Sequence, residues 1–314
     1  MLKLTFLGTG AACPSVDRNV SSLALTRDGE TMLFDCGEGT QRQMMRYGVS
    51  FAFSEIFFTH FHSDHLLGVT GLMRTLGLLN LFGEESRRAG LTLYGPRGAE
   101  KVLRQIMEVG IERVKFPVEI VELKVGDTLR RGEYDIVTFP TEHRADTLGY
   151  ALIEHPRLGR FHPEKARELG IPEGPLWGKI HKGEAITLPD GRSIRPEELV
   201  GGPRPGRKVV LSGDTRPCAG VREMAQGADL LVHEATFSHQ DLERAKETGH
   251  STAREAAELA AQAEVRHLIL THISPRYTRE APELLAEARA VFPESAIARD
   301  GMEVEVGYAA SGER

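Results

Sequence analysis

The chain has 314 residues, of which 40% are hydrophobic and 27% charged, and its formal net charge is −6. This composition is ordinary for a globular protein, and no apolar run approaches the roughly 20 residues needed to span a bilayer, so we expect a cytoplasmic protein with no membrane partner. The three cysteines, Cys13, Cys36 and Cys218, form no CxxC pair and indicate neither a disulfide framework nor a thiolate zinc site.

Up to about residue 153 the sequence predicts mainly strands, with two helices among them. Short β-prone runs bounded by turn residues indicate the strands. The predicted strands are residues 2–7, 22–26, 31–34, 55–59, 91–94, 119–123, 134–139 and 149–153, and the predicted helices are residues 38–47 and 99–109.

Residues 155–207 differ from the rest of the chain. They are rich in glycine and proline and show little core pattern beyond a short helix at 163–169. Residues 155–208 carry 11 Lys or Arg against 7 Asp or Glu, a net charge of +4, which leaves −10 for the remainder. We predict a flexible arm that protrudes from the domain, and its charge is compatible with either a nucleic-acid contact or an ordinary solvated insertion.

The last third of the chain alternates strands with helices. The predicted strands are 208–211, 229–232 and 267–270, and the predicted helices are 252–263 and 281–291. Such alternation implies strands covered by helices, and hence a layered α/β fold. We therefore expect a single α/β domain over residues 1–314 that carries the arm as an insertion.

The densest group of chemically active residues is Thr59-His60-Phe61-His62-Ser63-Asp64-His65, directly after the apolar run 55–58. Imidazole nitrogen and carboxylate oxygen are ligands of zinc and related divalent ions. On an extended chain the side chains of His60, His62 and Asp64 point the same way, while His65 opens a helix-like apolar run. One short loop can therefore offer ligands to two adjacent metals.

Three further candidate ligands come just after predicted strands. They are His143, Asp214 and His272, and loops at strand ends are where sheet proteins place their chemistry. Taken singly, either histidine could be a surface or core residue, and Asp214 could be a turn residue. Together with the loop they make five histidines and two aspartates, which suits two ions bridged by one carboxylate.

This pattern resembles the metal ligands of the metallo-β-lactamase superfamily, in residue type and in order along the chain. Asp35 also matches an early aspartate of that family. The resemblance covers almost the whole chain and implies a four-layer αβ/βα sandwich with two Zn²⁺ per subunit at the sheet edge, although the same ligands accept Mn²⁺ or other divalent ions. It assigns His60, His62 and His143 to one zinc, Asp64, His65 and His272 to the other, and Asp214 to both.

Other residues resemble the signatures of ribonuclease Z (tRNase Z), the endonuclease of tRNA 3′ processing. They are His233-Glu234-Ala235-Thr236-Phe237, Gly249-His250-Ser251-Thr252, the loop from Pro14 to Asn19, and Gly174-Pro175 in the arm. The loop has Val16 where that family has lysine. The resemblance implies precursor tRNA as the substrate, an arm that grips it as an exosite, and a homodimer. The substrate-binding residues that it suggests are Arg18, Asn19, Gly174, Pro175, Lys179, Lys182, Ser251 and Thr252.

The expected reaction is hydrolysis of the phosphodiester that joins the tRNA to its 3′ trailer. Two metals about 3.5–4 Å apart can supply a hydroxide near neutral pH and neutralise charge on the phosphate oxygens. Asp64 is the expected proton acceptor, and His250, held by Glu234, is the expected donor to the leaving 3′ oxygen. The products would be a tRNA 3′-hydroxyl and a trailer 5′-phosphate.

Structural alternatives exist for several of these residues. Thr252-Ala253-Arg254-Glu255 is a capping box, so Ser251 and Thr252 can simply start a helix. Arg18-Asn19 and Gly174-Pro175 can be turns. The alternative functions are a small-molecule phosphodiesterase or arylsulfatase-like hydrolase of the same superfamily, and a non-catalytic RNA-binding module.

Overall fold

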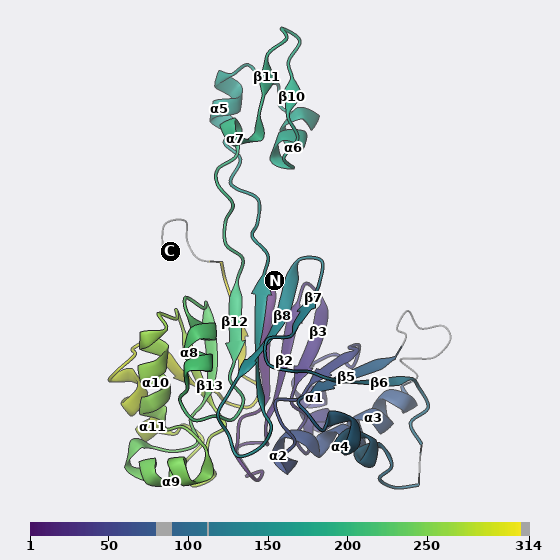
Figure 1. Ribbon diagram of the computed structural model, residues 1–314, viewed down its shortest axis with the longest axis vertical. Helices are drawn as coiled ribbons and strands as arrows, with labels where there is room; N and C mark the ends of the chain where they lie inside the picture. Colours follow the sequence, from purple (N-terminus) through teal and green to yellow (C-terminus); the bar gives the residue numbers. More distant parts are fainter. Residues whose placement is uncertain (80–89, 112, 309–314) are drawn as a thin grey trace.

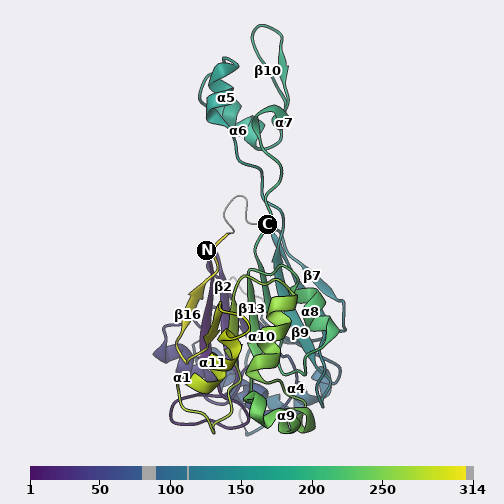
Figure 2. The ribbon, with the colours of Figure 1, turned by 90° about the vertical axis from the view of Figure 1, so that its left-hand side faces the viewer.

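Two seven-stranded sheets pack face to face, and helices cover the outer face of each. The computed structural model describes residues 1–79, 90–111 and 113–308. A slender arm rises from one end of this sandwich (Figures 1 and 2). The order of layers is the αβ/βα arrangement that the sequence predicts.

The first sheet has the strand order β16-β1-β2-β3-β4-β5-β6. Strands β1 to β3 pair antiparallel, whereas β3 to β6 run parallel, so the chain must cross over through a helix or long loop between successive parallel strands. The strands are β1 (Leu2–Gly8), β2 (Ser22–Arg27), β3 (Glu30–Phe34), β4 (Glu55–Phe57), β5 (Leu91–Gly95), β6 (Val118–Glu122) and β16 (Glu303–Glu305).

The second sheet has the order β15-β14-β13-β12-β9-β8-β7. Strands β12 to β15 are parallel, and β12 pairs antiparallel with β9. The C-terminal ends of β8, β12, β13 and β14 therefore lie at one end of the sheet. The strands are β7 (Thr128–Arg130), β8 (Tyr134–Pro140), β9 (Leu148–Glu154), β12 (Lys208–Leu211), β13 (Leu230–Glu234), β14 (Leu268–Thr271) and β15 (Ser295–Ile297).

The helices pack by their apolar sides on the sheets. Helix α10 shows why: Ala253, Ala256, Ala257 and Ala260 recur at helical spacing and are all fully buried against the second sheet. The helices on the first sheet are α1 (Thr40–Arg46), α2 (Ser63–Leu66), α3 (Gly68–Leu78) and α4 (Ala99–Met107). Those on the second are α8 (Ala219–Ala225), α9 (Leu242–Thr248) after the short turn η1 (His239–Asp241), α10 (Ala253–Gln262) and α11 (Pro282–Arg289).

An aromatic cluster between the sheets fixes strand β4. The Phe57 ring stacks on Phe34 and Tyr94, with centroids 5.1 and 4.6 Å away, and meets Tyr150 edge-on at 5.5 Å. The buried Tyr150 hydroxyl donates to the carbonyl of Phe58 at 2.8 Å. Because β4 leads directly into the histidine loop, this packing gives that loop a rigid base.

The arm leaves the domain after β9 and returns at β12, which are paired neighbours. We expected little core pattern there, but Ala166, Ile180 and Leu199 are fully buried in a small apolar cluster at its tip. Prolines stand at the first turn of each arm helix, where a missing N–H costs nothing, so they mark helix starts and not only loops. The tip holds α5 (Pro163–Glu168), α6 (Pro175–His181), α7 (Pro196–Leu199), β10 (Ile186–Thr187) and β11 (Ser193–Ile194).

Helix α3 extends the helix-like run that starts at His65, although three glycines lie within it. Gly68 stands where its first turn approaches the chain after β3, and a Cβ added there would lie 1.9 Å from the carbonyl oxygen of Gly37. Glycine is thus required for the close contact between the helix and the loop that carries Asp35. Among the described residues, no helix is long and apolar enough to cross a membrane.

Candidate metal centre

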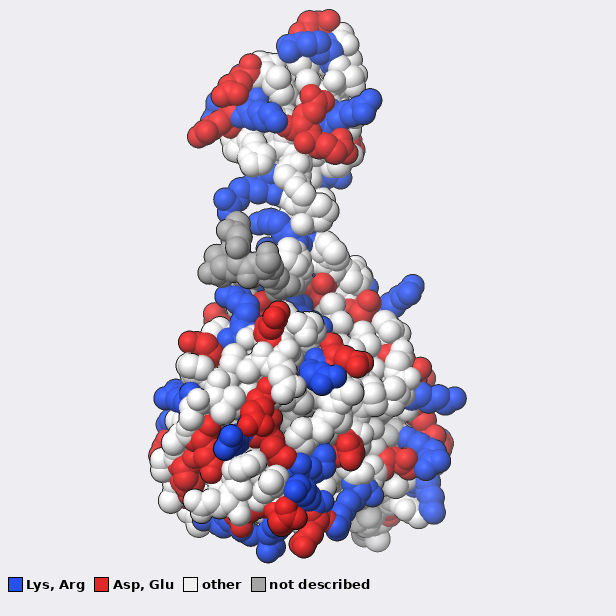
Figure 3. Space-filling view, turned by 60° about the vertical axis from the view of Figure 1, so that its left-hand side comes forward, with Lys and Arg blue, Asp and Glu red and all other residues white. Residues whose placement is uncertain are grey.

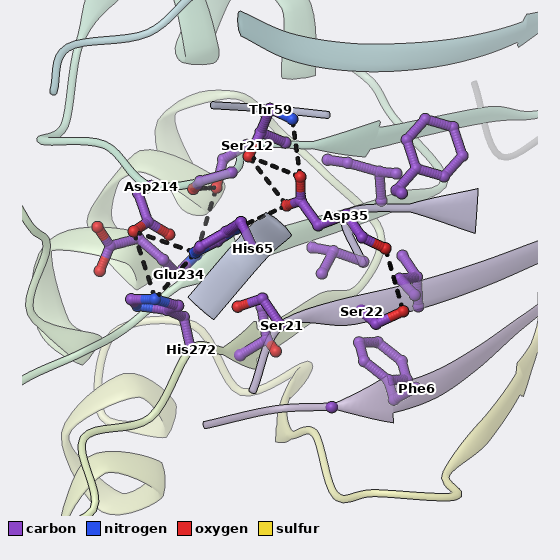
Figure 4. Close-up of a pocket in the computed structure, with 17 residues that line it drawn as sticks. Phe6, Ser21, Ser22, Asp35, Thr59, His65, Ser212, Asp214, Glu234 and His272 are labelled. Atoms are coloured by element: carbon purple, nitrogen blue, oxygen red, sulfur yellow. Dashed lines mark hydrogen bonds and ion pairs between the residues drawn. The ribbon is translucent and has the colours of Figure 1, made fainter. Parts of the chain in front are cut away.

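The predicted ligands meet where strands of the two sheets end. Figure 4 shows three of them, His65, Asp214 and His272. Strand β4 of the first sheet delivers the loop from His60 to His65. Three strands of the second sheet deliver the others: β8 is followed by His143, β12 by Asp214 and β14 by His272. The site therefore lies between the sheets, with ligands from both halves of the chain.

His60, His62, His143 and Asp214 form the first ligand group, with one ligand atom of each within 4.8 Å of the others. His60 Nε2 is 2.9 Å from His62 Nδ1 and 3.6 Å from Asp214 Oδ2. His143 Nε2 is 3.3 Å from His62 Nδ1. Three imidazoles with one carboxylate are a typical donor set for zinc.

Asp64, His65 and His272 form the second ligand group. His272 Nε2 is 3.3 Å from both Asp64 Oδ2 and Asp214 Oδ2. His65 Nε2 is 3.4 Å from the same Asp214 oxygen. Asp214 thus lies between the groups, and the structure brings together all seven ligands predicted from the sequence.

The partners of two histidines define which ring nitrogen faces the site. His65 Nδ1 is 2.8 Å from Asp35 Oδ2, and His143 Nδ1 is 2.8 Å from the carbonyl oxygen of Gly249. A carboxylate or a carbonyl can only accept, so each Nδ1 carries the hydrogen. In the neutral ring, each Nε2 then presents a lone pair to the site.

The hydroxyl of Thr59 fixes the tautomer of His60 in the same way. Thr59 Oγ1 donates to Asp35 Oδ2 at 2.9 Å, so it must accept from His60 Nδ1 at 3.1 Å. The Thr59 backbone N–H also donates to Asp35, at 2.8 Å. Asp35 therefore orients ligands of both groups at once.

His272 is oriented in the same way from strand β13. Thr236 Oγ1 donates to Glu234 Oε2 at 2.7 Å and accepts from His272 Nδ1 at 2.9 Å. When the rings are neutral, four Nε2 lone pairs and two carboxylates therefore converge on the site. This donor set fits divalent cations.

The backbone is strained at the same place. Asp35, His272 and Ala12 adopt left-handed conformations, with φ of 57°, 56° and 62°. Ala12 uses this geometry to donate its N–H to Asp64 Oδ2 at 2.7 Å. Such conformations are uncommon for residues with a Cβ and gather at functional sites, where surrounding contacts hold them.

The two carboxylates among the ligands are ionised at neutral pH. Burial opposes ionisation of Asp214, but His272, His65 and His60 outweigh it and hold its pKa well below the usual range. Burial is likewise overcome at Asp64 by its hydrogen bond with His272 and by nearby His65, which lower its pKa. The site therefore presents two negative charges to a cation.

A second buried pair stands beside the ligands. His250 Nδ1 is 2.9 Å from Oε1 of Glu234, which is 1% exposed. Burial would lower the pKa of His250, but the charge and hydrogen bond of Glu234 raise it to about 9. His250 is therefore protonated at neutral pH, 3.9 Å from Asp214.

Two hollows adjoin the centre. Behind the ligands, a cavity of about 60 Å³ between the sheets is bordered by Phe6, Ser22 and Ser212 (Figure 4) and has room for buried water. In front, an open cavity of about 430 Å³ is lined in part by Asp64 and His250. The front cavity is the side from which a substrate can reach the ligands.

Comparison with known proteins identifies the family of this chain. The chain matches the family model of the Anti-Pycsar protein Apyc1 over residues 2–156 and that of the Beta-lactamase superfamily domain over residues 198–273. It is 59% identical to a ribonuclease Z of Gemmatimonas aurantiaca, over 97% of this chain and 96% of that one, and 50% identical to one of Myxococcus xanthus, over 98% of each. The chain belongs to the ribonuclease Z family. The crystal structure of human tRNase Z, short form, is also similar, with a TM-score of 0.65 and 26% identity over 97% of this chain and 99% of that one.

Family membership confirms three of the predictions. The fold is that of the metallo-β-lactamase superfamily, and the enzyme is a ribonuclease Z, an endonuclease of tRNA 3′ processing. The predicted cluster of histidine and aspartate ligands is also present, in a form consistent with zinc.

The loop that resembles a ribonuclease Z signature turns its arginine inward. Arg18 is 2% exposed, and its guanidinium donates to Thr9 Oγ1 at 2.6 Å and to the carbonyl oxygen of Ala298 at 2.7 Å. Asn19 Nδ2 donates to the carbonyl oxygen of Glu38 at 2.8 Å. The predicted substrate contact of Arg18 is therefore corrected: this residue supports the loop, because its guanidinium is buried and hydrogen-bonded inside the domain.

Ser251 and Thr252 also have structural roles. Ser251 is fully buried and donates to the carbonyl oxygen of Thr215 at 2.6 Å. Thr252 caps α10: its Oγ1 accepts from the Glu255 N–H at 3.2 Å, while the Glu255 carboxylate accepts from the Thr252 N–H at 3.0 Å. Their predicted substrate contacts are corrected too, since both side chains are buried and fix the chain next to His250.

The arm residues lie away from the metal centre. Gly174 precedes α6 and Pro175 is its first residue, while Lys179 and Lys182 are exposed at the tip. Strand β9 begins beside the ligand loop, where the Leu148 N–H donates to the carbonyl oxygen of Thr59 at 2.9 Å, and it runs for seven residues before the arm starts. At about 3.3 Å per residue, the base of the arm is roughly 23 Å from the site.

Sequence reasoning missed the residues that aim the ligands, Thr59 and Thr236, and the arginines of the front cavity, Arg244 and Arg276. Thr59 directly precedes a ligand, so a search for hydroxyl or carboxyl neighbours of the histidines could have found it. Arg244 gives no such signal, because it reaches the cavity only through the position of α9.

Proposed function

We propose that this chain removes the 3′ trailer from precursor tRNA with two divalent cations, leaving a 3′-hydroxyl on the tRNA and a 5′-phosphate on the trailer. The observation that carries the proposal is the pair of ligand groups joined by Asp214, with the His250–Glu234 pair at their side. One arrangement thus offers positions for two cations, a carboxylate and a proton donor.

The residues assign positions to the cations. His60, His62 and His143 would hold one, Asp64, His65 and His272 the other, and Asp214 both. When bound, such cations supply a nucleophilic water near neutral pH and neutralise charge that develops on the phosphate oxygens. Zinc suits this donor set, and other divalent ions can replace it.

Asp64 is the proposed acceptor of the proton from the attacking water. Its carboxylate lines the front cavity, and its lowered pKa keeps it ionised at neutral pH. Oδ2 is held by the Ala12 N–H at 2.7 Å, which fixes the carboxylate plane. A fixed carboxylate at the attacking side is what general-base assistance requires.

His250 is the proposed donor to the leaving 3′ oxygen. Its Nδ1 is occupied by Glu234, so Nε2 is the atom left to donate a proton. The ring lies in the wall of the front cavity, on the side of Phe237, whose centroid is 6.2 Å away. Because its pKa is raised to about 9, it holds the proton at neutral pH.

The arm is the proposed exosite. Lys179 and Lys182 are exposed at the tip with no carboxylate of the described residues in an ion pair with them. By contrast, Arg167 and Arg192 pair with Glu173 and Asp190, and Figure 3 shows basic and acidic side chains next to each other on the arm. The two free lysines can meet RNA phosphates without reading bases, so the arm would contribute affinity and not chemistry.

We also propose a homodimer. Met45 on α1 and Leu67 and Leu78 along α3 expose apolar side chains, with 61%, 49% and 87% of their surface accessible. Leu67 and Leu78 are eleven residues apart and so share one side of the helix, which packs on α1. Exposed apolar side chains are suited to self-association, and sedimentation of Leu78→Glu against the unaltered protein tests it.

The experiment for the catalytic proposal offers the purified protein precursor tRNAs with and without an encoded CCA, in the presence and absence of a chelator, and maps the ends. Cleavage at the tRNA 3′ end that the chelator abolishes supports it. Turnover of bis(p-nitrophenyl) phosphate with intact precursor tRNA would favour the small-molecule phosphodiesterase, and bound RNA without cleavage would favour the binding module.

A further inference from the structure

Phe237 stands in the wall of the front cavity, and its ring contacts two arginines. The guanidinium carbon of Arg276 is 5.2 Å from the centroid of the ring, and that of Arg244 is 6.0 Å away. The other neighbour of the ring is His250, which it meets edge-on at 6.2 Å. All four residues line the same cavity, so the cationic wall continues directly from the proposed proton donor.

The two arginines differ in how their charge is used. Arg276 Nη1 is 3.0 Å from Asp241 Oδ2, an oxygen that also accepts from the Tyr277 hydroxyl at 3.1 Å. Arg244, an exposed residue of α9, has its ring contact with Phe237 but no ion pair with a carboxylate of the described residues. Its positive charge is therefore uncompensated on a cavity wall that leads to the metal centre.

An uncompensated guanidinium at this place is suited to a phosphate, which it can bind through two parallel hydrogen bonds. The RNA backbone offers one phosphate per nucleotide, so when the scissile phosphate is at the ligands its neighbours lie to either side. His250 faces the leaving 3′ oxygen, which belongs to the last nucleotide kept by the tRNA. The phosphate on the 5′ side of that nucleotide then lies beyond His250, toward Phe237 and Arg244.

We propose that Arg244 binds the phosphate on the 5′ side of the last nucleotide that the tRNA retains. Phe237, whose ring also contacts Arg276, positions the guanidinium. The inference rests on the proposed function, because it uses the side of the cut on which His250 acts. A contact one nucleotide from the cut reads no base, but it holds the register of the chain and so helps to define where the enzyme cleaves.

The test combines a variant with a modified substrate. Arg244→Met keeps the aliphatic length and removes the charge, and a methylphosphonate removes the charge of the single RNA phosphate. In the unaltered enzyme the methylphosphonate raises KM about tenfold, and Arg244→Met raises KM for ordinary precursor tRNA by the same factor. When the variant acts on the modified substrate, KM rises no further than with either change alone. The slope of log KM against log salt concentration falls by about one in the variant.

The matched control is Lys246→Met on the same helix. Lys246 is exposed, pairs with Glu243 at 2.7 Å and does not line the cavity. It should leave KM for precursor tRNA within twofold. Hydrolysis of bis(p-nitrophenyl) phosphate, which has no flanking phosphate, should also stay within twofold in Lys246→Met.

Three outcomes would overturn the inference. The rises in KM caused by Arg244→Met and by the methylphosphonate could be additive, or Lys246→Met could raise KM as much as Arg244→Met does. The third outcome is that the effect of Arg244→Met is non-additive with a methylphosphonate on the trailer side of the cut. Failure of the proposed function looks different, because the unaltered enzyme would then not cleave precursor tRNA at all. If it cleaves and the losses are additive, only the role of Arg244 is refuted.

Discussion

His250 Nδ1 lies 2.9 Å from Glu234 Oε1, and Glu234 is itself held by the Thr215 N–H at 3.0 Å and the Thr236 hydroxyl at 2.7 Å. With the Thr236 N–H, which donates at 3.2 Å, the carboxylate is thus fixed by four donors in a buried position. Such a network both orients the imidazole and keeps it charged. The same Glu234 acts through Thr236 on the ligand His272, so proton donor and metal centre share one support.

Glu234→Gln should move the alkaline limb of the pH–rate profile for precursor tRNA to lower pH. His250 must be protonated to act, and Glu234 raises its pKa to about 9. The amide removes that charge, so the limb falls by about two pH units toward the ordinary value and single-turnover activity at pH 8 drops about tenfold. In the unaltered enzyme with its cations bound, the alkaline limb lies at pH 9 or below, because the cations oppose protonation of the nearby His250.

His250→Ala provides the reference for this experiment, with a loss of about 10²–10⁴ in kcat. An unchanged alkaline limb in Glu234→Gln would contradict the assignment. The pair also contributes to folding stability. Since the pKa of His250 is raised on folding, this contribution is complete below the unfolded value near 6.5 and is lost as pH rises through about 9.

Asp35→Asn should weaken zinc binding by about 10- to 100-fold without removing a ligand. Asp35 accepts from His65 Nδ1 at 2.8 Å and from Thr59, so the amide disturbs the tautomers of both His65 and His60. Competition against a coloured chelator measures the affinity. Asp17→Asn, on an exposed part of the loop, is the control, and equal affinities in the two variants would refute the orienting role.

Removing the tip of the arm should affect binding of RNA and not the chemistry. Phe161 and Val200 pair across the stem, so deletion of residues 162–199 with a two-glycine link keeps the stem closed. We expect KM for precursor tRNA to rise by about tenfold or more, because phosphate contacts are lost, while hydrolysis of bis(p-nitrophenyl) phosphate stays within twofold. An equal loss on both substrates would show that the tip supports the domain and is not an exosite.

The base of the arm contains a buried ion pair whose loss should destabilise the protein. Arg207 donates to Glu154 at 2.6 and 2.8 Å, and their side chains are 5% and 3% exposed. Arg207→Met leaves the carboxylate with Arg27 alone and should lower the free energy of unfolding by about 3 kcal/mol. Arg254→Met, which breaks an exposed pair with Glu258, should cost less than about 1 kcal/mol. Equal losses in urea denaturation would contradict the importance of burial.

The metal ligands could be predicted because the information is local. His60, His62, Asp64 and His65 are spaced for convergence within one loop, and the other ligands each follow an apolar strand. Most strands were predicted for the same reason: apolar runs such as β12 (Lys208–Leu211) carry their own signal.

What could not be predicted depends on contacts between distant segments. Arg18 is separated by 280 residues from Ala298, whose carbonyl it binds, so its burial leaves no trace in the neighbouring sequence. The small apolar core of the arm was not predicted, because prolines mark both turns and helix starts. Arg244 is an ordinary helix residue by sequence, and it shares the cavity wall with residues of a distant segment such as Asp64.

The most direct measurement is a zinc titration of metal-free protein with precursor tRNA as the substrate, with mapping of both product ends. We predict that full activity appears only with the second equivalent of zinc, and that the products carry a 3′-hydroxyl on the tRNA and a 5′-phosphate on the trailer. Full activity in chelated protein or with one equivalent, or a cyclic phosphate at the cut, would contradict a two-cation centre built on Asp214.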